Sequence, residues 1–361
     1  MEILVVGGGP SGLTAAREAA LIGAKVTLIE EDREIGKPDH CAGLISISGL
    51  RNILPNYEDV VINRIRKVRI FSPMGREYEI SLREYKAVVV DRGKLDLKLM
   101  EMAERAGVKI ITNTPYNPSL KYDIMINAEG VKARICRRFG LEIPKSLPAI
   151  QFDLELSDFE RDAVEIYTGS IAPGFFAWLV PRYDHVRVGL ASEENPKRLL
   201  MNFIEKRFKA KILRTLWGKV VIGGPVNKAF KEKVVSIGDA GGFTKPTTGG
   251  GIVFGCLIAK MAGKMAALGK LSDFDREWKR IYLKEFRRML LAARIFRNMN
   301  YKELERVLEE INNSGLFEEL TSYDMDFQGS AILRVATSKV AISTLVPFLR
   351  SLKAYILEKF L

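Results

Sequence analysis

The sequence predicts a mixed α/β (α+β) fold, in which a parallel sheet with flanking helices is combined with an antiparallel sheet and a helical C-terminal region. The first 30 residues read as strand, glycine-rich turn, helix and strand, the pattern of a parallel βαβ unit. A further strand, glycine-rich turn and helix follow at residues 234–268. Short alternating segments bounded by turn residues lie between the two and indicate the antiparallel sheet.

Composition narrows the class of protein. The 361 residues allow two or three domains, and 56 Lys and Arg against 44 Asp and Glu give a net charge of +12. This excess suggests anionic partners, but no nucleic-acid-binding module is recognisable. With three Cys and two His, we expect no disulfide scaffold, no metal site and no Ser-His-Asp triad. The same scarcity of Cys predicts a reducing, cytoplasmic location, with peripheral membrane contact left open. Because residues 2–6 run straight into glycines, we expect no signal peptide.

The first glycine-rich turn has the spacing of a dinucleotide site. Gly7, Gly9 and Gly12 follow the first strand, and they would allow a tight turn, close approach of a pyrophosphate and close packing of helix on strand. The helix N-terminus then faces the phosphate charge. Glu30 ends the second strand, where an acid can accept a hydrogen bond from a ribose hydroxyl. The residues that we expect to contact the dinucleotide here are Gly7, Gly9, Pro10, Ser11, Gly12, Glu30 and Glu31.

The second glycine-rich segment distinguishes FAD from NAD. A strand at 234–237 ends in Gly238-Asp239, and Pro246 and three glycines lead into a helix that begins at Ile252. Such a segment can offer Asp239 to a ribityl hydroxyl and a helix N-terminus to electron-rich flavin positions. It resembles the GD-x-A-G…P…T-G-G-G-I segment of FAD-binding, Rossmann-like proteins of the para-hydroxybenzoate hydroxylase superfamily. The resemblance implies that FAD contacts Gly238, Asp239, Pro246, Gly249, Gly250, Gly251 and Ile252.

Two other segments resemble the same superfamily. Residues 88–96 resemble its Arg-x-x-Leu/Phe-Asp segment, which implies that Arg92 approaches the FAD phosphates, although a solvated cation at a helix start is the simpler reading. Residues 123–130 resemble its Ala-Asp-Gly element, with Glu129 in place of Asp and Gly130 following. The ten residues between Thr112 and Asp123, which include two prolines, are too few and too irregular for the strands that relatives place there.

The middle of the chain carries the predicted antiparallel sheet, one face of which we expect to cover the flavin and form a pocket. Its predicted strands are 67–71, 77–81, 149–156, 163–168, 174–180 and 185–191. We expect an FAD-binding domain at 1–62, 88–146 and 232–268, a substrate-binding sheet domain at 63–87 and 147–231, and a helical region at 269–361.

A more specific resemblance comes from residues 173–191. They read Pro-Gly-Phe-Phe-Ala-Trp-Leu-Val-Pro, then seven residues, then Gly-Leu-Ala. This is similar to the Tyr-x-Trp-x-Phe-Pro-x7-Gly-x-Gly motif of geranylgeranyl reductases, with Trp178 retained and Phe176, Val180 and Ala191 as replacements. Because Phe176 lacks the phenol, no role of that hydroxyl carries over.

Residues 36–45 resemble the Pro-x-x-Cys-x-Gly segment of the same family, and the whole resemblance covers about residues 1–260. It implies an enzyme similar to archaeal digeranylgeranylglycerophospholipid reductases. The residues of this segment that it implies at the flavin are Lys37, Cys41, Ala42 and Gly43, with His40 beside them.

The resemblance implies saturation of isolated C=C bonds in polyprenyl lipids, by hydride from reduced FAD and a proton. It makes Cys41, His40, Phe176 and Trp178 the candidate catalytic residues, and Cys41, His40 and flavin-bound water stay open as the source of the proton. Each has a simpler reading, as a buried thiol, a solvated loop residue or a core aromatic. Ferredoxin, reduced deazaflavin and NADPH stay open as electron donors. The rival functions are a monooxygenase or halogenase on the same scaffold, and a non-catalytic prenyl-lipid carrier.

The end of the chain is apolar and basic. Residues 331–361 hold five cations against one acid, among many large apolar residues. Two readings stay open: a helix packed on the body of the protein, or a basic amphipathic helix in a membrane interface. The uncharged run at 340–349 is too short to span a bilayer.

Overall fold

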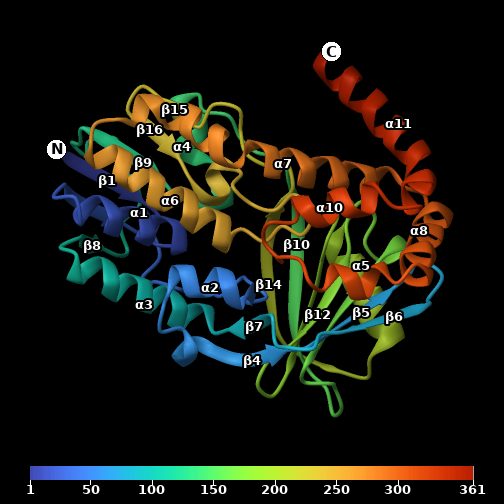
Figure 1. The fold of residues 1–361 in the computed structure, drawn as a ribbon. Coiled ribbons are helices and arrows are strands. Elements are labelled where there is room, and N and C mark those ends of the chain that lie inside the picture. Colours follow the sequence, from blue (N-terminus) through green and yellow to red (C-terminus); the bar gives the residue numbers. More distant parts are fainter. Residues whose placement is uncertain (361) are drawn as a thin grey trace. The chain divides into compact units, whose positions relative to one another are not determined.

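The computed structural model describes the backbone of residues 1–360 and the side chains of residues 1–351 (Figure 1). The chain divides into two compact units. The first unit comprises Met1–Val61, Val90–Ser146 and Val221–Phe286, and the second comprises Ile62–Val89, Leu147–Val220 and Arg287–Leu361. Strands β4 (Val61–Ile65) and β7 (Ala87–Val90) lie where the chain passes from one unit to the other.

The first unit contains the predicted parallel sheet. Its strand order is β15-β16-β9-β1-β2-β8. β1 pairs in parallel with β2 and β9, and only the short β15–β16 pair is antiparallel. The strands are β1 (Glu2–Val6), β2 (Lys25–Ile29), β8 (Lys109–Ile111), β9 (Ile124–Asn127), β15 (Phe230–Lys231) and β16 (Val234–Ser236). No regular element occupies residues 112–123, as the sequence predicts.

Helices α1 and α6 of this unit pack backbone against backbone. A Cβ atom built on Gly263 of α6 would lie 2.3 Å from the Ala15 carbonyl oxygen of α1, so the contact requires glycine. α6 covers Ile252–Ala267, in agreement with the helix predicted after the second glycine-rich turn. The helices of the unit are α1 (Pro10–Ala20), α2 (Ile47–Ile53), α3 (Arg92–Arg105), α4 (Arg134–Phe139), α6 and the first half of α7 (Phe274–Asn298). Strand β3 (Leu44–Ser46) also belongs to it.

The second unit is built on a sheet of order β14-β10-β13-β12-β11-β5-β6. The sequence predicts an antiparallel sheet, but β5 and β11 pair in parallel, so the sheet is mixed. β12 begins at Ala177 rather than at residue 174, because Gly174 has φ +78°. The sequence also missed β14, an edge strand. The strands are β5 (Lys67–Phe71), β6 (Glu77–Ser81), β10 (Ser146–Glu155), β11 (Ala163–Tyr167), β12 (Ala177–Pro181), β13 (Val186–Ala191) and β14 (Lys211–Val221).

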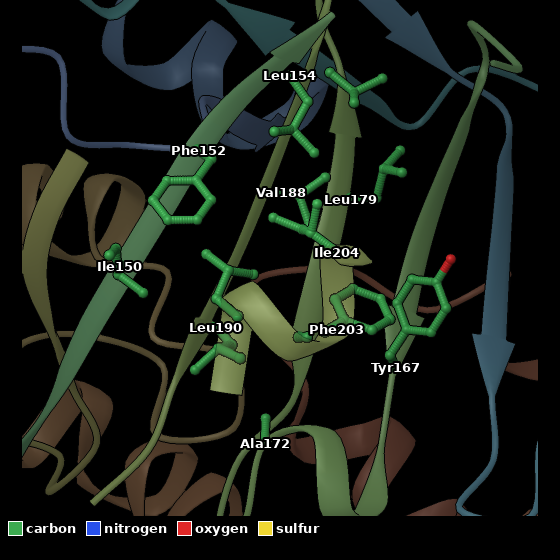
Figure 2. Packing of buried hydrophobic residues seen from close by; sticks show 13 residues of the cluster. Ile150, Phe152, Leu154, Tyr167, Ala172, Leu179, Val188, Leu190, Phe203 and Ile204 are labelled. Atoms are coloured by element: carbon green, nitrogen blue, oxygen red, sulfur yellow. The ribbon is translucent and has the colours of Figure 1, made fainter. Parts of the chain in front are cut away.

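A hydrophobic core covers one face of this sheet (Figure 2). Ile150, Phe152 and Leu154 of β10 point into it together with Val188 and Leu190 of β13. Helix α5 (Pro196–Arg207) closes the core with three side chains, Leu200, Phe203 and Ile204. Because side chains alternate along a strand, the intervening residues of β10 and β13 face the opposite side of the sheet.

The predicted helical region at 269–361 is helical but does not form a unit of its own. Its first part stays with the first unit, where Trp278 and Phe286 pack against Phe243 with ring centroids 5.3 and 6.3 Å apart. The remainder joins the second unit, where Leu304 and Phe317 pack on Tyr78 of β6. The helices concerned are α8 (Tyr301–Asn313), α9 (Leu316–Leu320), α10 (Gly329–Ala336) and α11 (Val340–Phe360).

Among the described residues, no single helix is long and apolar enough to cross a bilayer. The pair formed by Gly329–Ala336 and Val340–Ser351 reaches the required apolar length only when the two helices are taken together, and they are bent by 106°.

Candidate functional site

The glycines of the first turn serve two different purposes. A Cβ atom on Gly12 would lie 1.9 Å from the Gly7 carbonyl oxygen, so this glycine is required by the packing of the protein itself. A Cβ atom on Gly9 would have no neighbour within 4 Å, and Gly9 has an ordinary φ of −77°. The protein's own packing and backbone therefore do not explain a glycine at this position. A ligand that approaches the start of α1 closely would explain it.

Glu30 fixes this turn. Its carboxylate accepts hydrogen bonds from the backbone N–H groups of Gly8, at 2.6 Å, and of Asp32, at 2.9 Å. The acid at the end of β2 thus connects that strand to the glycine turn. It lies where the sequence predicts an acid that binds a ribose hydroxyl.

The two glycine-rich segments, more than 200 residues apart in the sequence, meet at Ser11. Cβ atoms on Gly238 and Gly255 would lie 2.7 and 2.5 Å from the Ser11 hydroxyl oxygen. Asp239 follows at the same place, and a Cβ atom on Gly251 would lie 2.8 Å from its carboxylate. Within the described part of the chain, no hydrogen bond reaches the Asp239 carboxylate. This acceptor, beside the N-terminus of α6, fits a ribityl hydroxyl.

Arg92 is a nearly buried cation that uses only some of its hydrogen-bond donors within the protein. Its side chain is only 14% exposed, which excludes the reading as a solvated cation. Its Nη2 donates to both Asp96 carboxylate oxygens at 3.1 Å, whereas its buried Nε has no hydrogen-bond partner within residues 1–351. Burial alone would lower the pKa of Arg92, but Asp96 and the Cys41 thiol raise it. A permanent cation with a donor to spare is suited to a phosphate.

The loop at residues 36–43 brings Cys41 to this arginine. Gly36 has φ +80°, and a Cβ atom on it would lie 2.9 Å from Gly93 Cα, so the loop packs directly on the start of α3. The Cys41 sulfur accepts a hydrogen bond from the Gly43 N–H at 3.4 Å and interacts with Arg92. Cys41 thus lies beside Arg92, with Ala42 and Gly43 following it in the chain, while His40 is exposed.

Besides Glu30, three predicted cofactor residues have partners within the protein. The Glu129 carboxylate caps α4, where it accepts from the N–H groups of Arg134 at 2.7 Å and Ile135 at 2.9 Å. Glu31 forms ion pairs with Lys132 and with Arg134, the latter at 2.8 Å. The exposed Lys37 pairs with Glu34 at 2.6 Å. The side chains of Glu129, Glu31 and Lys37 are therefore engaged by the protein, and Gly130 provides only backbone.

The first unit as a whole fits FAD. The open space at Gly9 and the spare donor of Arg92 suit a pyrophosphate, and the carboxylate of Asp239 suits a ribityl chain. The start of α6, at Gly249, Gly250, Gly251 and Ile252 after Pro246, gives a helix N-terminus for an electron-rich ring system.

On the second unit, three residues form one row across the sheet face opposite to the core. Gly189 of β13 is in register with Trp178 of β12 on one side and with Gln151 of β10 on the other. The Trp178 indole N–H donates to Gln151 Oε1 at 3.0 Å. A Cβ atom on Gly189 would lie 2.7 Å from the indole ring and 2.5 Å from Gln151 Cγ. The indole therefore reaches across the bare glycine to its acceptor.

Aromatic rings continue this row. Phe176 meets the Trp178 ring edge to face, with centroids 6.1 Å apart, and stacks on Phe175 at 4.2 Å. Phe176 and Trp178 are half-buried and lie outside the core of Figure 2, whereas Phe175 is buried. Phe176 and Trp178 are therefore not part of that hydrophobic core, contrary to the simpler reading of these two residues. Sequence reasoning missed Gln151, although a polar residue within the apolar strand Ala-Ile-Gln-Phe was a usable signal.

The next row of the same face holds a buried ion pair. The Arg187 guanidinium donates to the two Asp153 carboxylate oxygens, at 2.7 Å from Nε and 3.0 Å from Nη2. Arg187 is 1% exposed and Asp153 is 6% exposed. The pair neutralises the charge on an otherwise largely apolar face, and its two-point geometry fixes β13 against β10.

Comparisons with known proteins identify related flavoproteins. The family of FAD dependent oxidoreductases matches residues 2–136. Digeranylgeranylglycerophospholipid reductase 1 of Methanothermobacter thermautotrophicus is 30% identical over 94% of this chain and 94% of its own length. A geranylgeranyl bacteriochlorophyll reductase-like protein from Thermoplasma acidophilum has a similar fold, with a TM-score of 0.84 and 23% identity over 96% of this chain and 98% of its own.

The same fold occurs in flavoenzymes with other chemistry. A flavin-dependent brominase aligns over 99% of this chain and all of its own, with a TM-score of 0.68 and 13% identity. The fold therefore does not by itself choose the reaction, which has to be argued from the site.

Proposed function

Because this chain belongs to the family of digeranylgeranylglycerophospholipid reductases, we propose that it saturates isolated carbon–carbon double bonds in the geranylgeranyl chains of isoprenoid lipids. The chain is an FAD-dependent oxidoreductase. The observation that carries the proposed substrate class is the row of Trp178, Gly189 and Gln151 on the second unit. It offers a fixed aromatic surface with no unpaired polar group on the indole, which suits a hydrocarbon chain.

The first unit binds the cofactor. Gly9 leaves room for the pyrophosphate, Arg92 neutralises part of its charge, and Asp239 accepts from the ribityl chain. When bound and reduced, FAD supplies a hydride to one alkene carbon. The two hydrogen bonds to Asp96 hold the Arg92 guanidinium in place, which limits the reorganisation of this side chain on FAD binding.

The second unit holds the alkene. A trisubstituted alkene is not polarised, so transfer of a proton to one carbon leaves positive charge on the other. The faces of Trp178 and Phe176 can stabilise that charge without offering a nucleophile. An apolar surface also excludes water, which would trap the cation. The hydrogen bond to Gln151 orients the indole and makes Gln151 a positioning residue.

The proton must come from a group close to the flavin, and we assign it to Cys41 in preference to His40. Cys41 is half-buried and interacts with Arg92, whereas His40 is exposed. Cys41→Ala is expected to lower turnover strongly while FAD stays bound, and Cys41→Ser to restore part of the activity. Unchanged turnover of Cys41→Ala would remove the thiol from the reaction.

Product mass tests the reaction itself. Holoenzyme incubated anaerobically with a chemical reductant and a geranylgeranyl lipid is expected to yield a product that has gained two hydrogens per reduced bond. Incorporation of oxygen or halogen in aerated samples, without saturation, would support the monooxygenase or halogenase alternative instead. Replacement of the chemical reductant by ferredoxin, reduced deazaflavin or NADPH then identifies the donor.

A further inference from the structure

Helix α11 turns its smaller and more polar side toward helix α8 and the second half of helix α7, which belong to its own unit. Ser343 donates to the Glu310 carboxylate of α8 at 2.6 Å, and Ser351 donates to the Arg294 carbonyl of α7 at 3.2 Å. Val340 is 1% exposed and packs against Val307 and Leu316. These hydrogen bonds, the buried residues Val340 and Pro347, and the ion pair of Arg350 with Glu303 hold the first three turns of α11 in place.

The opposite side of the same turns is apolar and exposed. Ile342, Leu345, Val346 and Leu349 are 74%, 54%, 56% and 53% exposed. Their spacing of i, i+3, i+4 and i+7 places them on one stripe of the helix. We call these four residues the outer stripe. A surface helix of a globular protein normally buries such a stripe and exposes its polar side, so α11 is oriented the other way round.

The surroundings of the outer stripe favour a lipid surface over a protein. Leu333 of α10 is 49% exposed, and exposed Lys339 lies at the corner between α10 and α11. Arg334 and Arg350 are paired with Glu319 and Glu303, which leaves Lys339 as a cation with no described ion pair. No carboxylate side chain occurs in the sequence from residue 327 to residue 357, so nothing in this stretch repels an anionic headgroup.

We propose that the outer stripe, with Leu333 and Lys339, docks the protein on a bilayer leaflet that carries anionic headgroups. The 106° bend between the two helices is suited to lying in the interface rather than to crossing it. The proposal rests on the proposed function in one respect: a substrate with two geranylgeranyl chains resides in such a leaflet. The docking gives the enzyme access to a lipid that is almost absent from water.

Vesicle co-sedimentation with the full-length holoenzyme tests the proposal without any turnover. The probe is unilamellar vesicles of phosphatidylglycerol and phosphatidylcholine. We expect the wild-type protein to sediment with them, and the variant Leu345→Gln/Leu349→Gln to show a partition coefficient lower by at least roughly tenfold. The matched control is Leu21→Gln/Leu268→Gln, which removes two leucines of similar exposure, 57% and 55%, from the first unit. The control is expected to bind like wild type.

Three outcomes overturn the proposal: a wild-type protein that does not sediment with vesicles, equal binding by both variants, or a wild-type dimer that Leu345→Gln/Leu349→Gln converts to monomer, since the outer stripe would then be a contact between copies. Turnover of a detergent-dispersed geranylgeranyl substrate is measured in parallel. Loss of vesicle binding with turnover retained supports docking, whereas vesicle binding without alkene reduction would leave docking standing and refute the proposed function.

Discussion

The two units provide binding surfaces of different kinds. In the first unit the backbone shapes the binding surface, because glycines at positions 7, 9, 12 and 238 let chain segments and a cofactor approach one another closely. In the second unit side chains form the binding surface. Strand register brings Trp178 and Gln151 into one row and the Asp153–Arg187 pair into the next. A charged, hydrogen-bonding cofactor needs fixed N–H donors and space, whereas a flexible hydrocarbon needs a rigid, dry surface.

The comparison teaches that a glycine can be essential for opposite reasons. Gly12 makes room for the protein itself, Gly9 makes room for a ligand, and Gly189 makes room for an aromatic ring of the same sheet. Substitutions by alanine can therefore separate folding, cofactor binding and substrate handling in one chain. The predictions below use that separation.

The largest effect is expected from Asp153→Ala. The substitution leaves the Arg187 guanidinium buried and without its carboxylate, which typically costs about 3–5 kcal/mol of unfolding free energy. Urea unfolding followed by circular dichroism measures it. Glu194→Ala, which removes an exposed partner of Arg198 in the same unit, is the control and should change the unfolding free energy little. Equal stability of the two variants would show that the pair does not hold the second sheet.

Gly12→Ala and Gly9→Ala are expected to differ in kind. In Gly12→Ala the added methyl meets the Gly7 carbonyl, so the unfolding free energy should fall by about 1–3 kcal/mol or more. Gly9→Ala has space for the methyl, so stability without FAD should be unchanged while the Kd for FAD rises by roughly 100-fold, because the methyl occupies the ligand's place. Thermal melts measure the stability of the two variants, and flavin-fluorescence titrations measure their Kd for FAD. Wild-type FAD affinity in Gly9→Ala would contradict the assigned site.

A third comparison concerns the row of Trp178, Gly189 and Gln151 on the second unit, which we propose to hold the substrate. Gly189→Ala forces the Trp178 indole away from Gln151, and turnover should fall roughly 10- to 100-fold with FAD binding intact. Gly218→Ala in edge strand β14, where a Cβ atom would meet nothing within 4 Å, is the matched control. Steady-state assays and the flavin absorption spectrum are the two measurements. A Gly189→Ala enzyme with wild-type turnover would mean that the row is structural only.

The smallest effect is a pH dependence of FAD binding. Burial raises the pKa of Asp239 above its ordinary value, although Arg92 opposes the shift. A ribityl hydroxyl donates to the charged carboxylate, so bound FAD lowers that pKa again. FAD therefore binds most tightly at pH values above the raised pKa of Asp239 in the free protein, and its affinity decreases as the pH falls below that pKa. FAD titrations at several pH values should show this loss of affinity at low pH in the wild type and not in Asp239→Asn.

The sequence signals for the cofactor site proposed in the first unit are local. A glycine spacing, the strand before it and the helix after it lie within 30 residues, and the structure brings Ser11, Gly238 and Asp239 together as the motifs imply. Four predicted cofactor side chains, those of Glu30, Glu31, Lys37 and Glu129, have partners within the protein and show the limit of such local signals. Glu129 matches a motif position, yet which group its carboxylate meets depends on the N-terminus of α4.

The second unit was less accessible because its signals are not local. Gln151 and Trp178 are 27 residues apart and become partners only through strand register. The long edge strand β14 carries no motif, and the parallel pairing of β5 with β11 follows from a connection of more than 90 residues that no short pattern encodes. The orientation of α11 was likewise unreadable, since the same amphipathic sequence fits a packed helix and an interfacial one.

One measurement tests the central claim most directly: the visible spectrum of the chemically reduced holoenzyme when a geranylgeranyl lipid is added under argon. We predict that the absorbance of oxidised flavin returns without oxygen, with one reduced flavin (two electrons) consumed for each double bond that becomes saturated. A flavin that stays reduced until air is admitted, with a product that then contains added oxygen, would contradict the account.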